Sequence, residues 1–221
     1  MPRFLAVALA ICLPAACLAA EPQATPLAAS QALERLMEGN ARYVAGEAQY
    51  PNQSSVRRAM VSQGQSPIAV IVGCSDSRVP PEIVFDRGIG DLFIVRTAGQ
   101  AVEDDVDLGS IEYAVDHLHV PLIVVLGHER CGAVDAALKG MEAPGHIQSL
   151  VVAIRPAVEA IKGQPGDALE NAINANIRLV TDRLRNSQPI LAGPVKTGEL
   201  MIVGARYDFH SGKVTIMDEG K

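Results

Sequence analysis

The sequence lacks tryptophan, is poor in other aromatic residues and has no block of lysine and arginine. Aromatic residues make up 4% of its 221 residues, and the formal net charge is −6. Proteins that bind nucleic acids carry a basic stripe and often stack bases on aromatic side chains. The sequence therefore predicts no nucleic-acid partner. A hydrophobic share of 48%, with 20% charged residues, is typical of a folded domain and excludes a disordered acidic chain.

Long hydrophobic runs are also missing, except near the N-terminus. Arg3 precedes an uncharged, mostly apolar run over residues 4–20, which Pro14 interrupts. A basic start, a short apolar run and small residues before polar sequence are typical of a secretory signal. We therefore predict a signal peptide at 1–20, a linker at 21–29 and a single domain at 30–221. The mature protein is then periplasmic or secreted and free of the membrane. An uncleaved anchor and a lipoprotein attached at Cys17 are the alternatives.

Cysteine is scarce as well. Of the four cysteines, Cys12 and Cys17 leave with the predicted signal peptide, so that Cys74 and Cys131 remain. Two cysteines in an oxidising compartment form one disulfide by default. The residues around them therefore decide between a disulfide and another role.

Short, continuously apolar runs indicate strands that are buried on both faces. They cover residues 67–73, 92–95 and 120–126, with a helical pattern over 106–119 between the second and third. Strands that alternate with helices favour a parallel sheet covered on both faces, which is an α/β fold. Ligands of such sheets bind beyond the carboxyl ends of the strands. Cys74 and His128 both follow such a strand, so we expect a site there.

The rest of the chain extends this pattern. A helix is predicted from Ser30, as its N-cap, to Val44, and further helices over residues 146–162 and 168–186. Two strands at 199–207 and 213–217, joined by a tight turn at 208–212, are expected to form a closing hairpin.

Two thiols and one imidazole follow the predicted strands, and this set is one that Zn²⁺ prefers. Zn²⁺ takes cysteine and histidine ligands in tetrahedral geometry, and a catalytic site keeps one position open. Cys74, His128 and Cys131 are the candidate ligands. Asp76 is ambiguous, because it can fill the fourth position or pair with Arg78 and leave room for water. In the second arrangement Asp76 can orient a zinc-bound hydroxide, which the metal makes available near neutral pH.

Other interpretations of these residues remain open. Cys74 and Cys131 can form a disulfide in a binding domain, or the site can hold zinc without catalysing a reaction. The other four histidines are expected at the surface or at helix ends, and Tyr113 in the core; these histidines are His117, His119, His146 and His210.

Several longer segments resemble one family. CSDSR at 74–78, followed by VPPE, is similar to the first signature of the β-class carbonic anhydrases. The resemblance continues, in the family's order and spacing, through LMEGNARYVAG at 36–46, GDLFIVRTAG at 90–99, SIEYAV at 110–115, LGHERCGAV at 126–134 and GARYDFHSGKVT at 204–215.

The resemblance implies a fold, an activity and a set of roles. It implies an α/β/α sandwich around a mainly parallel central sheet, with an N-terminal helical arm that lies on a partner subunit of a homodimer or homotetramer. It implies reversible hydration of carbon dioxide to bicarbonate and a proton, with one Zn²⁺ per subunit. Related folds also act on carbonyl sulfide or carbon disulfide. The residues matching Cys74, His128 and Cys131 hold zinc, and the one matching Asp76 pairs with that matching Arg78 or closes the metal site.

The resemblance is incomplete at one position. Members that bicarbonate regulates have a tryptophan where this chain has Ile71, although Arg96 and Tyr207 match the other two residues of that pocket. The resemblance therefore does not imply bicarbonate inhibition.

Overall fold

A computed structural model describes residues 27–218, and the predicted signal peptide lies outside these residues. The chain forms one five-stranded sheet in the order β2-β1-β3-β4-β5. The first four strands of this order run parallel, and β5 runs antiparallel to β4. The strands are β1 (Ala69–Cys74), β2 (Leu92–Thr97), β3 (Leu122–His128), β4 (Met201–Tyr207) and β5 (Val214–Asp218).

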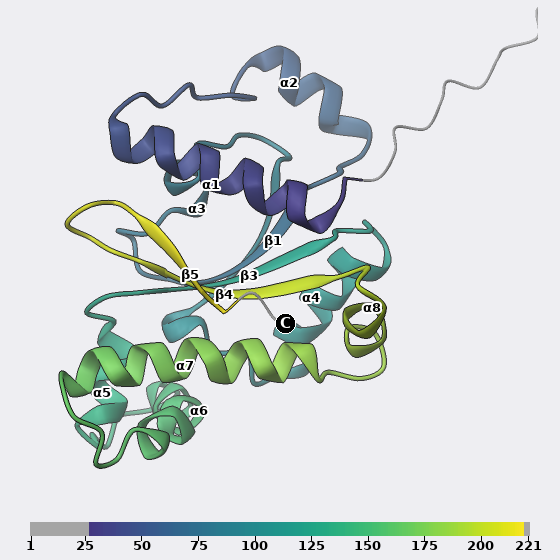
Figure 1. Cartoon of the computed structure of the whole chain (residues 1–221). Helices are drawn as coiled ribbons and strands as arrows, with labels where there is room; N and C mark the ends of the chain where they lie inside the picture. The colour runs from purple at the N-terminus through teal and green to yellow at the C-terminus, as the bar shows by residue number, and fades with distance from the viewer. Residues whose placement is uncertain (1–26, 219–221) are drawn as a thin grey trace, which may run out of the picture.

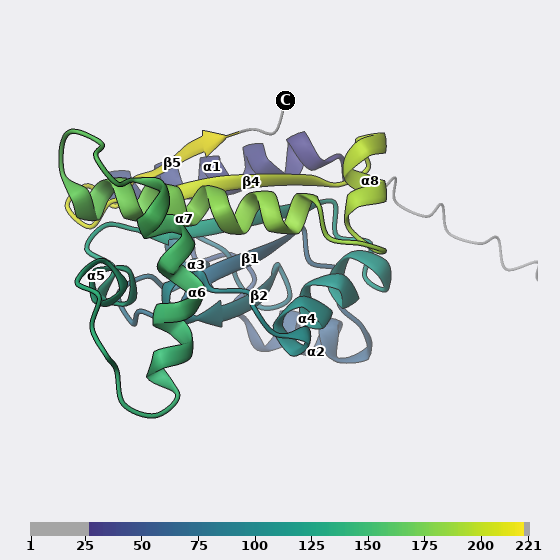
Figure 2. The same cartoon turned by 90° about the horizontal axis from the view of Figure 1, so that it is seen from below.

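Helices cover both faces of the sheet (Figures 1 and 2). On one face lie α1 (Ala29–Ala45), α2 (Ser55–Met60) with the 3-10 turn η1 (Val61–Gln63), and α3 (Pro81–Val84). On the other lie α4 (Asp105–Asp116), α5 (Gly132–Leu138), α6 (Ile147–Ala160), α7 (Ala168–Arg185) and α8 (Ala192–Thr197). A second 3-10 turn, η2 (Ala98–Gln100), follows β2. The predicted α/β/α sandwich around a mainly parallel sheet is confirmed.

The alternation of side chains along the strands divides the core into two layers. Val70 and Val72 of β1 pack in the cluster that includes the helices α4 to α7. Ala69 and Ile71, between them, pack in the cluster that includes α1 and α3. Neighbouring strand residues point to opposite faces of a sheet, so a strand buried on both faces is apolar throughout. This is why β1 and β3 are continuous hydrophobic runs in the sequence.

Helix α1 packs on the sheet of its own chain. Ala32 and Leu36 on its inner face are fully buried. Asn40 donates to the carbonyls of Val84 and Gly212 at 3.1 and 2.9 Å, which ties the helix to α3 and to the closing hairpin. The expectation that this helix lies on a partner subunit is therefore wrong for its apolar face, which this chain already covers.

The start of α1 also differs from the prediction. Its N-cap is Ala28, whose N–H donates to Gln31 Oε1 at 3.2 Å, and Ser30 lies in the first turn. The other predicted helices and strands are present within a few residues of their expected ends. The short helices α3 and α8 are absent from the predictions, because four- and six-residue helices carry too little periodicity to be recognised. No described helix is long and apolar enough to cross a membrane.

A buried carboxylate fastens the segment that follows α1. Asp86 is 3% exposed, and it accepts hydrogen bonds from Arg42 Nε at 2.7 Å and from the N–H groups of Gln49 and Tyr50 at 3.1 and 2.9 Å. Burial by itself raises the pKa of Asp86, but these donors outweigh it and leave the pKa below its ordinary value. Asp86 is therefore charged in the folded protein at neutral pH.

We expect Asp86→Ala to lower the free energy of unfolding by about 3 kcal/mol, because one buried charge partner and two backbone donors lose their acceptor. Urea denaturation at neutral pH measures this loss. The contribution of Asp86 is full above about pH 4, the ordinary pKa of an unfolded aspartate, and disappears as pH falls through the lower folded-state pKa. Asp135→Ala is the control, because its ion pair with Lys139 is exposed and worth little. Equal effects of the two variants would contradict the prediction.

Candidate metal centre

The strand order brings the three candidate ligands to one edge of the sheet. Strands β1 and β3 are parallel neighbours, so their carboxyl ends, Cys74 and His128, meet at the same edge. After β3 the chain turns at Arg130, which has a left-handed φ of 51°. Cys131 follows as the N-cap of α5 and is thereby returned toward the strand ends.

The ligand atoms of these residues form a compact and buried group. The two Sγ atoms and a ring nitrogen of His128 all lie within 4.8 Å of one another. Cys74, His128 and Cys131 are 5%, 0% and 2% exposed. Both cysteines are free thiols, so the disulfide interpretation is wrong. Buried polar side chains of this kind need partners, and here they face one another.

The imidazole of His128 is oriented for metal binding. Its Nδ1 lies 2.8 Å from the carbonyl oxygen of Glu129, which fixes the proton on Nδ1. Its Nε2 then carries a lone pair, and this atom is buried without a hydrogen-bond partner. An unpaired buried acceptor within 4.8 Å of two thiols suits a zinc ligand, so the residues fit Zn²⁺.

The two thiols differ in how readily they lose a proton. The hydrogen bond with Cys131, helped by His128 and the Gly99 N–H, lowers the pKa of Cys74 to about 4 although burial opposes it. The same hydrogen bond, together with burial, raises the pKa of Cys131. The pair therefore shares a proton, and Cys74 is the thiolate. Thiolates are the metal-binding form of cysteine, and a bound cation displaces the remaining proton.

Asp76 is bound by Arg78 in this structure. Arg78 Nε and Nη2 donate to the two carboxylate oxygens at 2.9 and 2.7 Å, and the Arg78 N–H donates at 2.9 Å. These bonds hold the pKa of Asp76 at about 2. Asp76 Oδ2 lies 3.8 Å from His128 Nε2, beside the group of three ligands rather than within it. Of the two arrangements left open by the sequence, the structure has the Asp76–Arg78 pair.

Arg96 supports this arrangement, a role that the sequence analysis missed. It donates to the carbonyl oxygens of Cys74 and Asp76 at 2.8 and 2.6 Å, so it braces the turn that connects ligand and carboxylate. The signal in the sequence is a lone charge in the otherwise uncharged strand LFIVRT. A partly buried charge in a strand needs hydrogen-bond partners, and here the partners are the carbonyls of the Cys74–Asp76 turn.

Phe209 is a second residue that the sequence analysis missed. Its ring lies 4.2 Å from the Arg78 guanidinium and 5.3 Å from the His128 ring. Its N–H donates to Glu129 Oε1 at 2.8 Å, which holds the residue in place. The ring thus contacts both the Arg78 guanidinium and the imidazole of a candidate ligand. Nothing in the sequence relates Phe209 to Arg78, because the two are 131 positions apart along the chain.

We expect Phe209→Leu to lower kcat of the reaction proposed below by about two- to five-fold, which corresponds to one partly exposed cation–π contact. Leucine keeps apolar bulk but has no π face to hold the guanidinium. Steady-state kinetics with the zinc content measured in parallel gives this value. Tyr113→Leu is the control, because its ring is exposed and stacks on His117. An unchanged kcat in Phe209→Leu would count against a role for the ring.

The remaining candidate residues lie elsewhere. The four other histidines are exposed, as predicted; they are His117, His119, His146 and His210. Tyr113 is 45% exposed, so its predicted place in the core is wrong. Its ring lies on the outside of α4, where it contacts Phe93 and His117.

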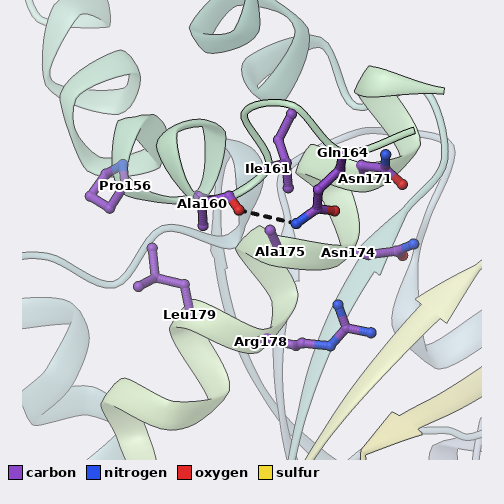
Figure 3. A pocket seen from close by; sticks show the side chains of 10 residues that line it. Pro156, Ala160, Ile161, Gln164, Asn171, Asn174, Ala175, Arg178 and Leu179 are labelled. Carbon is purple, nitrogen blue, oxygen red and sulfur yellow. Dashed lines mark hydrogen bonds between the residues drawn. The ribbon is translucent and has the colours of Figure 1, made fainter. Parts of the chain in front are cut away.

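A separate groove of about 430 Å³ lies between α6 and α7 (Figure 3). Apolar side chains such as Leu179 line it together with the amide groups of Asn171 and Asn174 and the side chain of Arg178. None of the candidate ligands lines this groove, so it is distinct from the metal centre.

Comparisons with known proteins agree with the geometry. A family model described as carbonic anhydrase matches residues 69–214, which include all the candidate site residues. The chain is 42% identical over 201 residues to carbonic anhydrase 2 of Mycobacterium tuberculosis, covering 89% of this chain and 95% of that protein. It is 41% identical over 199 residues to a carbonic anhydrase of Mycolicibacterium smegmatis, covering 88% and 95%.

Solved structures share the fold. The β-carbonic anhydrase CafA of Aspergillus fumigatus is 25% identical, with a TM-score of 0.68 over 86% of this chain and 92% of that one. One of two β-carbonic anhydrases of Sordaria macrospora, described as tetrameric, is 23% identical, with a TM-score of 0.67 over 84% and 96%.

Proposed function

The chain belongs to the carbonic anhydrase family, and on that premise we propose that it is an exported β-class zinc enzyme that works as a homo-oligomer. The reaction is the reversible hydration of carbon dioxide to bicarbonate and a proton. The observation that carries the proposal is the buried group of two thiols and the unpartnered His128 Nε2, next to a carboxylate that an arginine already holds.

Cys74, His128 and Cys131 would hold the Zn²⁺. When bound, zinc supplies a Lewis acid that lowers the pKa of a coordinated water from about 15.7 toward 7, or less far with two thiolate ligands. We therefore expect activity to rise with pH. The ligands themselves are buried, so bulk water does not compete for the cysteine and histidine donors.

Asp76 orients the attacking water. Its carboxylate accepts hydrogen bonds from Arg78 and has no proton of its own at neutral pH, because Arg78 holds its pKa at about 2. It can therefore accept a hydrogen bond from the water and direct a lone pair of that oxygen toward the carbon of CO₂. Arg96 keeps Asp76 at a fixed position relative to Cys74 through two backbone carbonyls. Positioning of this kind contributes to rate by removing orientational freedom before the reaction.

The proposal is tested by metal analysis and a stopped-flow CO₂ hydration assay over the neutral to alkaline range. We expect about one zinc per chain and an activity that rises with pH. Zinc without activity at any pH would support a non-catalytic zinc protein instead. Turnover of carbonyl sulfide or carbon disulfide with no hydration of CO₂ would support the other reaction class. Absence of zinc from active protein would contradict the metal centre.

Export is proposed from the sequence at residues 1–20, which combines Arg3, an apolar run and small residues before Glu21. The intact mass of the protein recovered from the periplasm or the medium tests it. A mass that lacks about twenty N-terminal residues is expected. Retention of residues 1–20 would contradict a cleaved signal.

The homo-oligomer is proposed as a dimer or tetramer. Its support in this chain is a set of exposed apolar side chains on the α1 side of the sheet: Val56 and Met60 of α2 and Ile83 of α3 are 68%, 69% and 57% exposed. Exposed apolar side chains gathered on one side are typical of interfaces. Light scattering after size exclusion measures the assembly, and a monomer at micromolar concentration would contradict it.

A further inference from the structure

The turn η2 directs a backbone N–H toward the sulfur of a candidate ligand. The Gly99 N–H donates to Cys74 Sγ, with an N···S distance of 3.2 Å. A hydrogen bond to a thiolate draws electron density from the sulfur and so sets how strongly the sulfur donates to a metal. The orientation of this one peptide group therefore bears on the metal centre.

The backbone of this turn is unusual. Gly99 and Gln100 are both left-handed, with φ of 71° and 44°. Left-handed φ is uncommon for a residue other than glycine and persists only where surrounding contacts hold it. A Cβ on residue 99 would lie 2.7 Å from Ile154 Cδ1 and 3.2 Å from Ala133 Cβ, and any side chain there would be strained by the left-handed φ, so the position favours glycine. Contacts from outside the turn must therefore keep the Gly99 N–H aimed at the sulfur.

Asn176 of α7 provides such a contact. Its Nδ2 donates to the Gly99 carbonyl oxygen at 2.9 Å, across 77 positions of sequence. Asn176 is 1% exposed. A polar side chain buried on the inner face of a helix costs stability unless it is hydrogen-bonded, and such positions are usually apolar. The amide is therefore best explained by the bond that it makes to Gly99.

Helix α7 packs closely enough against the sheet to hold the Asn176 amide in place. A Cβ on Gly127 of β3, next to His128, would lie 2.5 Å from Ile177 of the helix. The helix thus packs directly against β3, the strand that carries His128. The neighbouring Asn176 bonds to the turn η2, which faces Cys74. This fixes the position of the Asn176 amide relative to the metal centre.

We propose that Asn176 is a positioning residue for the metal ligand Cys74 and that it acts through the backbone of Gly99. The inference rests on the zinc function proposed above. Without the Asn176 amide the turn relaxes and the Gly99 N–H turns away from the sulfur. Cys74 then loses a hydrogen bond that fixes its sulfur and is less well placed for the metal, so zinc binds more weakly. Once bound, the sulfur donates more strongly, which reduces the Lewis acidity available to the water.

The test compares Asn176→Leu with Thr181→Val on the same helix. Leucine has the same branched heavy-atom skeleton as Asn176 and removes its donor. Thr181 is fully buried and its hydroxyl donates to the Ile177 carbonyl at 2.7 Å, so valine removes a buried hydrogen bond of the same helix away from Gly99. The readouts are zinc affinity by competition with a chelator and the sulfur-to-cobalt charge-transfer band of the Co²⁺-loaded protein.

We expect Asn176→Leu to bind zinc about 10- to 100-fold more weakly, the usual cost of losing an outer-shell partner, and to shift the cobalt band to longer wavelength. Thr181→Val should match the wild type in both readouts even if it unfolds more easily. Wild-type affinity and band in Asn176→Leu would overturn the inference, as would equal changes in the two variants.

If the leucine variant fails to fold, Asn176→Ser replaces it and is judged by the same criteria, because the serine hydroxyl is too short to reach Gly99. Failure of the wild type to bind zinc or cobalt would overturn the zinc function as well. If the wild type binds both metals and Asn176→Leu behaves like it, only the role of Asn176 is overturned.

Discussion

Replacing Cys131 with serine is expected to empty the zinc site and to reduce CO₂ hydration to background. Loss of an outer-shell partner costs metal affinity by about 10- to 100-fold, and loss of a ligand itself must cost more. Serine is a poor replacement because its hydroxyl stays protonated at neutral pH and is a harder donor than a thiolate. The activity falls with the metal, since the water then keeps its ordinary pKa of about 15.7.

The design needs a second variant and a control for folding. His128→Ala should have the same effect, because it removes the buried Nε2 that has no partner in the protein. His119→Ala is the matched control, since His119 is exposed and lies on the turn before β3, at the other end of that strand. Zinc content is measured by mass spectrometry of the native protein, together with circular dichroism. Stoichiometric zinc and wild-type activity in Cys131→Ser would contradict the metal centre.

The group of candidate ligands could be predicted from the sequence because each lies at a strand end or a few residues after it. Cys74 and His128 follow apolar runs, and parallel strands bring such ends together whatever the details of packing. Cys131 lies three residues after His128, so the local turn determines its direction. The choice between metal and disulfide could not be made from strand ends alone; the structure excludes the disulfide, because both thiols are free and lie beside His128.

The residues that hold the site could not be predicted in the same way. Arg96, Asn176 and Phe209 reach the site from β2, from α7 and from the closing hairpin. Their roles depend on side-chain direction and on how closely helices seat against the sheet, which periodicity does not report. The same holds for α1: its amphipathic pattern predicts a buried face but does not tell whether this chain or a partner covers that face.

The sequence also left two roles open for Asp76, and Asp76→Asn distinguishes them. If Asp76 orients the water, we expect kcat for CO₂ hydration to fall about a hundred-fold. This is the lower end of the range for losing a side chain that accepts a hydrogen bond or proton from the reacting group. The amide is nearly isosteric, but its one oxygen belongs at the Oδ1 position, where Arg78 donates two hydrogen bonds. Its NH₂ group then takes the place of Oδ2, where it loses the bond from Arg78 Nη2 and cannot accept a hydrogen bond from the water. Zinc affinity should stay within about twofold of the wild type, because Asp76 lies outside the ligand group in this structure.

A fourth ligand would behave in the opposite way. If Asp76 closes the site at rest, the amide weakens zinc binding and opens a position to water, so that affinity falls while kcat is retained or rises. Asp135→Asn controls for the loss of one negative charge near the centre, since Asp135 is four residues from Cys131 and pairs with Lys139 at the surface. Stopped-flow kinetics and chelator competition on the same preparations separate the two outcomes. Because Arg78 already satisfies both carboxylate oxygens, at 2.9 and 2.7 Å, ligation by Asp76 would have to break a charge-assisted pair, and this favours the orienting role.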